Sequence, residues 1–341
     1  MSPAIVSRWL FPALVMLLLI AIWLSLALGP VSLPLADTLR ALFGLSAPES
    51  HAQAELIVSQ IRLPRTLLGL LVGAVLALTG VAMQGLFRNP LADPGLIGVA
   101  SGAALGAAIV IVGVSRWLDL PPALEPYVLS AAAFGGGLLV TTLVYRLGRR
   151  DGETHVATML LAGVALAALS GAVIGLLTYL ADDATLRALT FWNLGSLNGA
   201  SYPRLWPLLL VVLGVAVWLP RRAAALNALL LGESEARHLG FEVERVKREL
   251  IFCTALGVGA AVAAAGLIGF VGLVVPHLMR LLVGPDHRLL LPASALAGGA
   301  LLLFADLAAR LVVAPAEMPI GIVTALIGAP FFLYLLIRSR G

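Results

Sequence analysis

Long stretches of apolar residues alternate along this chain with short polar segments that carry most of its charge. A helix needs about 20 mostly apolar residues to cross the roughly 30 Å hydrocarbon core of a bilayer. Nine stretches reach or approach that length: Leu10–Leu28, Thr66–Phe87, Pro94–Ser115, Pro126–Tyr145, Val156–Ala181, Leu205–Pro220, Leu250–Met279, Leu289–Ala305 and Met318–Ile337. The pattern predicts an all-α, polytopic membrane protein.

One of these stretches is too long for a single simple crossing. Leu250–Met279 has 30 residues, which would form a helix of about 45 Å at 1.5 Å per residue. Its middle contains Gly266, Gly269 and Gly272, and Pro276 follows them. We therefore expect two helices separated by a glycine-rich break, which brings the prediction to about ten transmembrane helices.

Composition supports a membrane protein and excludes an ordinary soluble enzyme. Hydrophobic residues make up 60% of the 341 residues and charged residues only 12%, whereas soluble proteins average about 25% charged residues. The first apolar stretch, Leu10–Leu28, is long for the hydrophobic region of a signal peptide, so we expect it to be a retained helix.

The distribution of basic residues predicts the orientation of the chain. Ten crossings place both termini on one side, and a cytoplasmic N-terminus leaves 15 of the 22 Lys and Arg residues on the inner side. Lys and Arg are enriched in cytoplasmic loops. We therefore predict that both termini are cytoplasmic, and we attribute the net charge of +4 to this bias rather than to nucleic-acid binding.

Two inward-facing segments stand out from ordinary loops. Arg221–Glu249 holds 11 of the 40 charged residues, and within it Glu233–Leu239 lies between two glycines. This predicts a short helix that could dock a soluble partner; the alternative is a solvated loop.

The second segment, Arg88–Gly95, contains two prolines, an Asn and an Asp. It should form a stiff turn, which suits either a cytoplasmic gate or a simple connector.

Charged residues on the outer side suggest a further site. Arg62 and Arg65 flank Leu-Pro just before the second apolar stretch and should present fixed positive charge to the exterior, suited to pairing with carboxylates. Interfacial snorkelling is the alternative. Asp306 and Arg310 have the spacing of a local ion pair. Asp306 is nearly the only carboxylate at membrane depth, and this scarcity argues against a proton-driven carrier.

Several kinds of chemistry have no counterpart in the sequence. Lys247 is the only lysine and is followed by Arg248, so no phosphate-binding G-x-x-x-x-G-K-[ST] loop exists. No cluster resembles a zinc site or a catalytic triad. Cys253 is the only cysteine. We predict no catalytic residue, no metal ligand and no cofactor bound by this chain.

The motifs resemble one known family along nearly the whole chain after the first helix. In the first half they are Arg62-Leu-Pro-Arg65, Gly80-Val-Ala-Met-Gln84, Asn89-Pro-Leu-Ala-Asp-Pro-Gly95 and Ser101-Gly-Ala. In the second half they are Ile268-Gly-Phe-Val-Gly-Leu273, Pro276-His277, Gly284-Pro-Asp-His-Arg288, Ala316-Glu-Met-Pro-Ile-Gly321 and Gly328-Ala-Pro330. Together these motifs resemble the permeases of type II ABC importers, which carry iron–siderophore complexes, haem and cobalamin.

The resemblance implies a single transmembrane permease domain over residues 1–341, with a cytoplasmic coupling segment at about 221–249. Such a subunit lies in the bacterial inner membrane and pairs with a second copy of itself. Two cytoplasmic ATPase subunits, which hold ATP and Mg, and an external substrate-binding protein complete the importer.

The resemblance also implies residue roles. Arg62 and Arg65 match arginines that dock onto glutamates of the binding protein, and Arg310 falls in a similar outer position, so all three are predicted docking residues. Asn89, Pro90 and Leu91 match the cytoplasmic gate. The element that couples to the ATPase corresponds to Glu233, Ser234, Glu235, Ala236, Arg237, His238, Leu239 and Gly240.

Cargo is inferred from two further tracts, Ala236–Lys247 and Val283–Arg288, which look most like those of haem-importing members. They lie on the ATPase side, so they indicate kinship rather than a haem pocket. A ferric siderophore or cobalamin is the alternative cargo. An ion-coupled secondary carrier and a membrane protein without transport activity remain competing functions.

Overall fold

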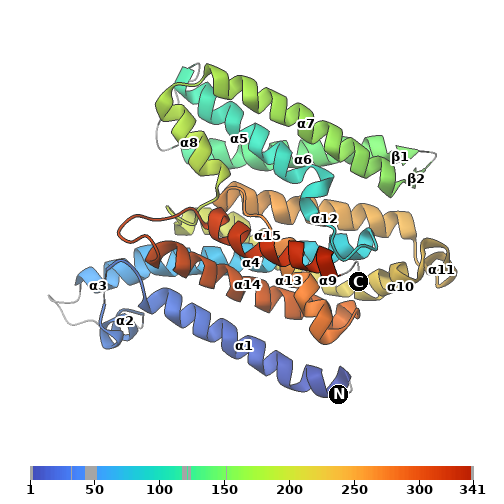
Figure 1. Cartoon of the computed structure of the whole chain (residues 1–341), viewed down its shortest axis with the longest axis horizontal. Coiled ribbons are helices and arrows are strands. Elements are labelled where there is room, and N and C mark those ends of the chain that lie inside the picture. Colours follow the sequence, from blue (N-terminus) through green and yellow to red (C-terminus); the bar gives the residue numbers. More distant parts are fainter. Residues whose placement is uncertain are drawn as a thin grey trace.

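The computed structural model describes residues 3–31, 33–42, 52–116, 121, 124–150 and 152–338. The extreme termini of the predicted 1–341 domain therefore lie outside the described residues. Long helices form a bundle in which neighbours run roughly along one common direction (Figure 1). This arrangement is the one expected in lipid, where each backbone polar group must be satisfied within its own segment.

Ten helices in the described part of the chain are apolar and of membrane-spanning or nearly spanning length. Seven are long: α1 (Pro3–Ala27), α4 (Leu63–Leu86), α6 (Glu125–Gly148), α7 (Val156–Leu180), α9 (Tyr202–Arg221), α12 (Val243–Ala265) and α14 (His287–Leu311). Three have shorter apolar stretches: α5 (Val99–Arg116), α13 (Val271–Val283) and α15 (Ile320–Arg338). The prediction of about ten helices agrees with this count.

Short elements gather at the two ends of the bundle (Figure 1). One end carries α2 (Leu35–Leu42), α3 (Ala52–Leu56), the π-helix η1 (Ile57–Arg62) and α8 (Asp183–Asn193). The other end carries the 3₁₀-helix η2 (Pro94–Ile97), α10 (Ala223–Leu231), α11 (Glu233–His238) and a small antiparallel hairpin of β1 (Arg149–Arg150) and β2 (Glu153–Thr154). The all-α prediction did not include this hairpin.

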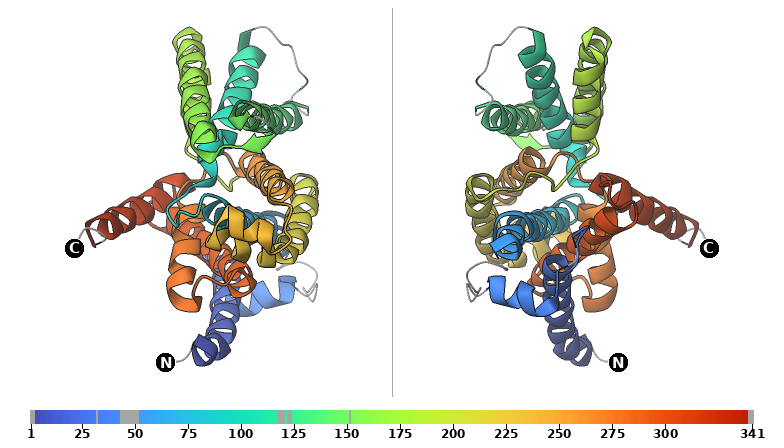
Figure 2. Two further views of the ribbon diagram at one scale, coloured as in Figure 1. Left: turned by 90° about the vertical axis from the view of Figure 1, so that its right-hand side faces the viewer. Right: turned by 90° about the vertical axis from the view of Figure 1, so that its left-hand side faces the viewer.

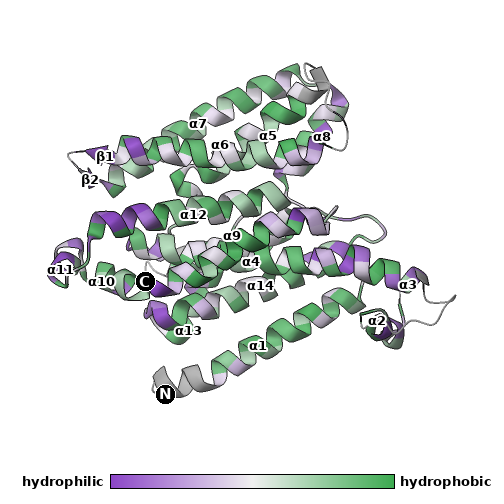
Figure 3. Cartoon of the chain, turned by 180° about the vertical axis from the view of Figure 1, so that it is seen from behind, coloured by the Kyte–Doolittle hydropathy of each residue, from purple (hydrophilic) through white to green (hydrophobic). Residues whose placement is uncertain are grey.

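The two ends are polar and the middle of the bundle is apolar (Figure 3). Helix α1 begins and α15 ends at the same end as the hairpin and α11 (Figure 1), which fits an even number of crossings. The bias of basic residues makes this the cytoplasmic end. The opposite end, with α2, α3 and α8, is the external end.

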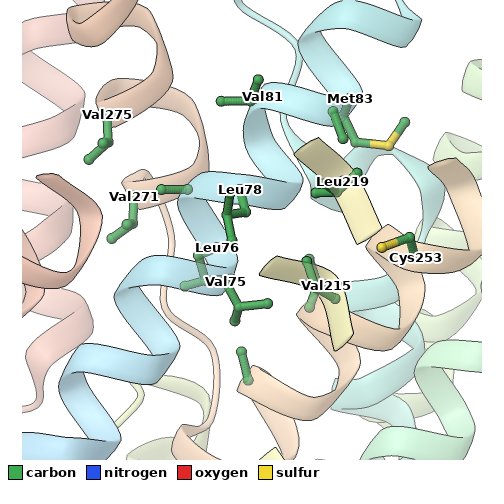
Figure 4. Packing of buried hydrophobic residues seen from close by; sticks show 14 of the residues in the cluster. Val75, Leu76, Leu78, Val81, Met83, Val215, Leu219, Cys253, Val271 and Val275 are labelled. Atoms are coloured by element: carbon green, nitrogen blue, oxygen red, sulfur yellow. The ribbon is translucent and has the colours of Figure 1, made fainter. Parts of the chain in front are cut away.

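Helix α4 forms the centre of the bundle. It packs against α9, α12, α13 and α14, and 78% of its most apolar stretch is buried. Val75, Leu78 and Val81 lie among side chains from these neighbours (Figure 4). Gly73 lets α4 approach α14 closely, because a Cβ at that position would overlap the carbonyl oxygen of Gly298. Close approach through small residues is the usual way that helices associate in lipid.

Two spanning helices are far less buried than α4. Only 17% of the most apolar stretch of α7 is buried, although it packs against α5 and α6. These three helices form a lobe beside the central group, and α15 projects away from the bundle toward the C-terminus (Figure 2). The apolar surfaces of α7 and α15 are therefore available to lipid or to another protein.

The glycine-rich break is where the sequence predicted it. Helix α12 ends at Ala265, and α13 begins at Val271. Gly266 has a φ of +70° and Phe270 a φ of +67°. Phe270 adopts the left-handed helical conformation just before α13, whereas Gly266, just after α12, adopts a different positive-φ conformation that glycine takes up easily.

Two features of the neighbouring residues were not defined by the sequence pattern. Helix α12 begins at Val243 rather than near Leu250, because a helix can extend beyond the hydrocarbon core into water. The segment Arg221–Glu249 is also not polar throughout: it contains the apolar helix α10, whose Leu226 and Leu229 are buried against the core.

Candidate functional site

Three arginines expected at the external surface are in fact buried. Only 4% of Arg62, 7% of Arg65 and 3% of Arg310 is exposed. The expectation that Arg62 and Arg65 present fixed charge to the exterior was therefore wrong. The reason is tertiary packing: acceptors from α1, α14 and the segment after α14 surround the guanidinium groups, and buried cations are stable only with such partners.

Arg62 and Arg310 bind the end of α1. Arg62 Nη1 donates hydrogen bonds of 2.8 Å to the carbonyl oxygens of Leu26 and Ala27, and Arg62 Nη2 donates to that of Val31. Arg310 Nη1 donates to the carbonyl oxygen of Leu28 at 3.2 Å. The last carbonyls of a helix have no partner within it, and cations near them interact favourably with the helix dipole.

Arg65 and Arg310 share one buried carboxylate. Arg65 Nε lies 3.0 Å from Asp306 Oδ1, and Arg310 Nε lies 3.0 Å from Asp306 Oδ2. Arg65 Nη1 also donates to both carboxylate oxygens of Glu317 at 3.0 Å. The predicted ion pair between Asp306 and Arg310 is therefore confirmed. Neither the contact of Glu317 with Arg65 nor the contact of Arg65 with Asp306 was predicted from the sequence.

These five residues, Arg62, Arg65, Asp306, Arg310 and Glu317, are called here the external charge cluster. Three cations face two carboxylates, so the cluster carries one formal positive charge in excess. Arg62 accounts for it, because the hydrogen bonds of its side chain within the described part of the chain go only to carbonyl oxygens. One incoming carboxylate would make the cluster electrically neutral.

The cytoplasmic turn after α4 has a defined geometry. Asn89 Oδ1 accepts a hydrogen bond of 2.9 Å from the Leu91 amide, and the Asn89 carbonyl accepts one of 3.1 Å from Ala92. Asn89 and Pro90 are exposed, whereas Leu91 is half-buried. This is an Asx-type turn, in which the Asn side chain holds the backbone. The stiff turn expected here is present, and its role as a gate stays a prediction.

Asp93 completes the turn by capping η2. Its Oδ1 accepts a hydrogen bond of 2.7 Å from the Gly95 amide. Burial raises the pKa of Asp93, and the hydrogen bond from Gly95 opposes that rise. The backbone between α4 and α5 is thus held at two points, by Asn89 and by Asp93.

The predicted cytoplasmic helix exists as α11. Gly232, with a φ of +134°, precedes it, and Gly240, with a φ of +87°, follows it. Ala236 is buried, while Leu239 is 60% exposed. The short helix is therefore present with one exposed apolar side chain, and its role in docking a partner stays a prediction.

Lys247 attaches α11 to the rest of the protein. This lysine is only 2% exposed, and its Nζ lies 2.6 Å from Glu233 Oε2 and 3.0 Å from Glu244 Oε1. It also donates to the Thr154 carbonyl at 3.0 Å. Glu244 accepts a hydrogen bond of 2.8 Å from the Thr154 amide. One buried ammonium group therefore joins α11, α12 and the β1–β2 hairpin.

A second contact between α11 and the hairpin lies in solvent. Arg237 Nη2 and Glu153 Oε1 are 2.8 Å apart, and about half of each side chain is exposed. Sequence reasoning named Arg237 and Glu233 as members of the coupling helix but found neither the hairpin nor the role of Lys247. The available signal was that Lys247 is the only lysine in the chain.

A bundle of apolar helices, with a charge cluster at one polar end and a short exposed helix at the other, is the architecture of a multi-pass membrane protein. The model of the FecCD transport family matches residues 17–338. Because this match covers most of the sequence, the chain belongs to the FecCD transport family.

Individual proteins agree with that membership. The chain is 45% identical over 330 residues to the hemin transport system permease protein HmuU of Yersinia pestis, with 96% of this chain and 97% of that protein covered. It is 43% identical over 337 residues to the vitamin B12 import system permease protein BtuC of Klebsiella pneumoniae, with 98% and 95% covered.

A solved structure has the same architecture. It is an ABC transporter assigned to the metal-chelate type, in an inward-facing conformation. It is 35% identical to this chain, superposes with a TM-score of 0.84, and aligns over 97% of this chain and 99% of its own.

Proposed function

We propose that this chain is the membrane-spanning permease subunit of an ATP-driven importer in the bacterial inner membrane, and that its cargo is haem delivered by an external binding protein. The observation that supports haem as the cargo is the 45% identity with the hemin permease HmuU across nearly the full length of both chains. Cobalamin is the second candidate, favoured by the 43% identity with BtuC.

ATP hydrolysis then belongs to a partner. The sequence lacks a phosphate-binding lysine loop, so two cytoplasmic ATPase subunits would hold ATP and Mg, and this chain would bind no cofactor. The helix α11 and the adjoining Gly240 would dock into each ATPase. Exposed Leu239 supports this assignment, as do the buried contacts of Lys247, which let α11 transmit force to α12 and the hairpin.

A second copy of the chain would complete the pathway. The weakly buried helix α7 and the projecting helix α15 offer large apolar surfaces for such a contact. Cargo would cross between the two copies. The turn at Asn89, Pro90 and Leu91 would then stand at the cytoplasmic exit as a gate, a role that suits its doubly held backbone.

The external charge cluster would receive the binding protein. The buried positions of Arg62, Arg65 and Arg310 limit this role, because only carboxylates that reach the cluster can interact with it. The positive charge in excess at Arg62 supports docking of a glutamate or aspartate, since one carboxylate would neutralise the cluster.

Uptake into sealed proteoliposomes tests the proposal. The chain is reconstituted with its ATPase, and haem, cobalamin and a ferric siderophore are each offered on their binding proteins. Haem accumulation that requires ATP supports both mechanism and cargo. ATP-dependent accumulation of cobalamin alone keeps the importer and corrects the cargo. Accumulation that is independent of ATP and abolished by an uncoupler contradicts the importer and favours an ion-coupled carrier.

A further inference from the structure

A cavity of about 350 Å³ lies between α6, α9 and α12. Phe134, Pro207, Val211, Ala260 and Ala263 give it a mostly apolar lining. Its volume falls within the 300–1,000 Å³ range of typical small-molecule pockets. The cavity is distinct from the external charge cluster, which is built from α1, η1, α4, α14 and Glu317.

The cavity lies in the external half of the membrane. It is lined near the start of α6 by Tyr127 and near the start of α9 by Pro203, and both helices begin at the external end. From α12, which ends externally, it takes residues of the last turns, including Ala264.

A polar mouth adjoins the apolar cavity. A second cavity of about 130 Å³ shares Ser130, Arg204, Ala263 and Ala264 with the first, and adds Ser196 and Asn198 from the segment before α9. The combined groove is therefore apolar toward the membrane centre and gains polar lining residues toward the external surface. An amphiphile has the same distribution of polarity.

Arg204 provides a positive charge at the boundary between the two parts. Its Nη1 makes one long hydrogen bond, of 3.3 Å, to the carbonyl oxygen of Gly199. No carboxylate in the described ranges forms an ion pair with it. A half-buried guanidinium group without an anionic partner favours an anionic ligand, and phosphate fits its planar donors.

Exposed aromatic side chains place the mouth at the level of lipid headgroups. Tyr127 is 53% exposed and Trp206, one turn into α9, is 61% exposed. Tyr and Trp are enriched at the boundary between hydrocarbon and water, where the ring meets acyl chains and the polar atom meets headgroups. Arg204 lies in the same outer region, in the first turn of α9.

We propose that this groove binds one phospholipid of the outer leaflet, with an acyl chain in the cavity between α6, α9 and α12 and the phosphate at Arg204. The charge of Arg204 and the change from apolar to polar lining favour a phospholipid over a helix of a second copy, which would bring no phosphate. This inference does not depend on the identity of the cargo or on coupling to ATP.

Native mass spectrometry of the purified chain, after delipidation and titration with phosphatidylglycerol, tests the proposal. We expect one phospholipid per chain to persist. Arg204→Gln should weaken its binding about tenfold, because a charge-assisted hydrogen bond is lost. Ala131→Phe, at an exposed residue that lines the cavity, should weaken binding by filling the groove. Arg187→Gln, at another exposed external arginine, is the matched control and should change nothing.

Two further arms identify the occupant. Glycerol phosphate, which lacks acyl chains, should not bind at the concentrations at which the lipid does. A phospholipid with a photoreactive acyl chain should crosslink to the wild-type protein within 126–134, 203–211 or 260–264. Crosslinks elsewhere, equal lipid binding by all variants, or binding of glycerol phosphate as tight as that of the lipid would overturn the proposal.

Discussion

Arg65 and Asp306 are 241 positions apart in the sequence, yet two guanidinium nitrogens of Arg65, Nε and Nη2, lie 3.0 Å from Asp306 Oδ1. The contact joins the central helix α4 to α14 at the external end. Both side chains are almost entirely buried, and Arg310 holds the other carboxylate oxygen. A carboxylate fixed between two cations is a structural element and is poorly suited to relay protons, which argues against an ion-coupled carrier.

Removing this carboxylate should strongly destabilise the protein. Asp306→Ala removes the carboxylate that Arg65 and Arg310 share and leaves both arginines buried near each other. Breaking a buried ion pair costs about 3–5 kcal/mol. Unfolding by titration with SDS measures the loss. The control is Glu242→Ala, whose side chain is 73% exposed and whose partner Arg245 is 57% exposed, so that its loss should cost less than about 1 kcal/mol. Equal effects of the two substitutions would contradict a structural role for Asp306.

Within the external charge cluster, Arg62 is the residue to test for docking. Arg62→Gln removes the charge in excess while leaving both ion pairs of Asp306 in place. We expect the affinity for the binding protein to fall about tenfold or more, since a hydrogen bond to a charged group is lost. Surface plasmon resonance against the binding protein measures the change.

A control separates docking from folding. Arg204→Gln also removes one external arginine but lies outside the cluster, so it should leave the affinity unchanged. Unaltered affinity of a folded Arg62→Gln variant would refute the docking role.

Lys247 should determine how firmly α11 is attached. Lys247→Met removes the ammonium group that joins Glu233, Glu244 and the Thr154 carbonyl, and it leaves the carboxylates without their buried partner. We expect hydrogen exchange to accelerate at amides of α11 and of β2. Arg237→Ala removes only the exposed pair with Glu153, worth about 0.2–1 kcal/mol, and should have little effect. Equal hydrogen-exchange rates at these amides in Lys247→Met and Arg237→Ala would show that Lys247 is not the main attachment of α11 to α12 and the hairpin.

Gly73 should be intolerant of any side chain. A Cβ there overlaps the Gly298 carbonyl oxygen, so Gly73→Ala must separate α4 from α14, at a cost of about 1–3 kcal/mol. Gly214 on α9 has open space around its Cβ position, and Gly214→Ala should be neutral or slightly stabilising because alanine favours helix. Thermal unfolding in detergent compares the two. A Gly73→Ala protein as stable as the wild type would mean that the helices are not in close contact.

Asp286 should make α14 sensitive to acid. Its carboxylate accepts hydrogen bonds from the Arg288 amide at 3.0 Å and from Asn227 Nδ2 at 2.6 Å, and these bonds lower its pKa from the ordinary value of 3.8. A lowered pKa contributes stability that is present above the ordinary value and is lost as pH falls through the folded-state pKa.

Thermal unfolding as a function of pH measures this contribution. Above pH 4, Asp286→Ala should be less stable than the wild type by about 1 kcal/mol through loss of the helix cap. The difference should shrink as pH falls below about 3.8. A difference in stability between Asp286→Ala and the wild type that stays constant with pH would show that the charge of Asp286 does not contribute to stability.

The sequence by itself determined the number of spanning helices, their orientation and the family. Each of these rests on local properties. The length and hydropathy of a segment decide whether it crosses a bilayer, and the basic residues beside it decide its direction. The break at Gly266–Phe270 and the short helix after Gly232 could likewise be predicted, because glycine acts on the backbone in its own vicinity.

Only the tertiary structure decided which charges meet. The sequence placed Arg62, Arg65 and Arg310 on the external side but could not show that they are buried, because their partners come from distant segments: the end of α1, Asp306 and Glu317. The same holds for Lys247, whose partners include Thr154. Hydropathy and helical period depend on neighbours in sequence, whereas an ion pair depends on three-dimensional proximity, which only the packing of the helices creates.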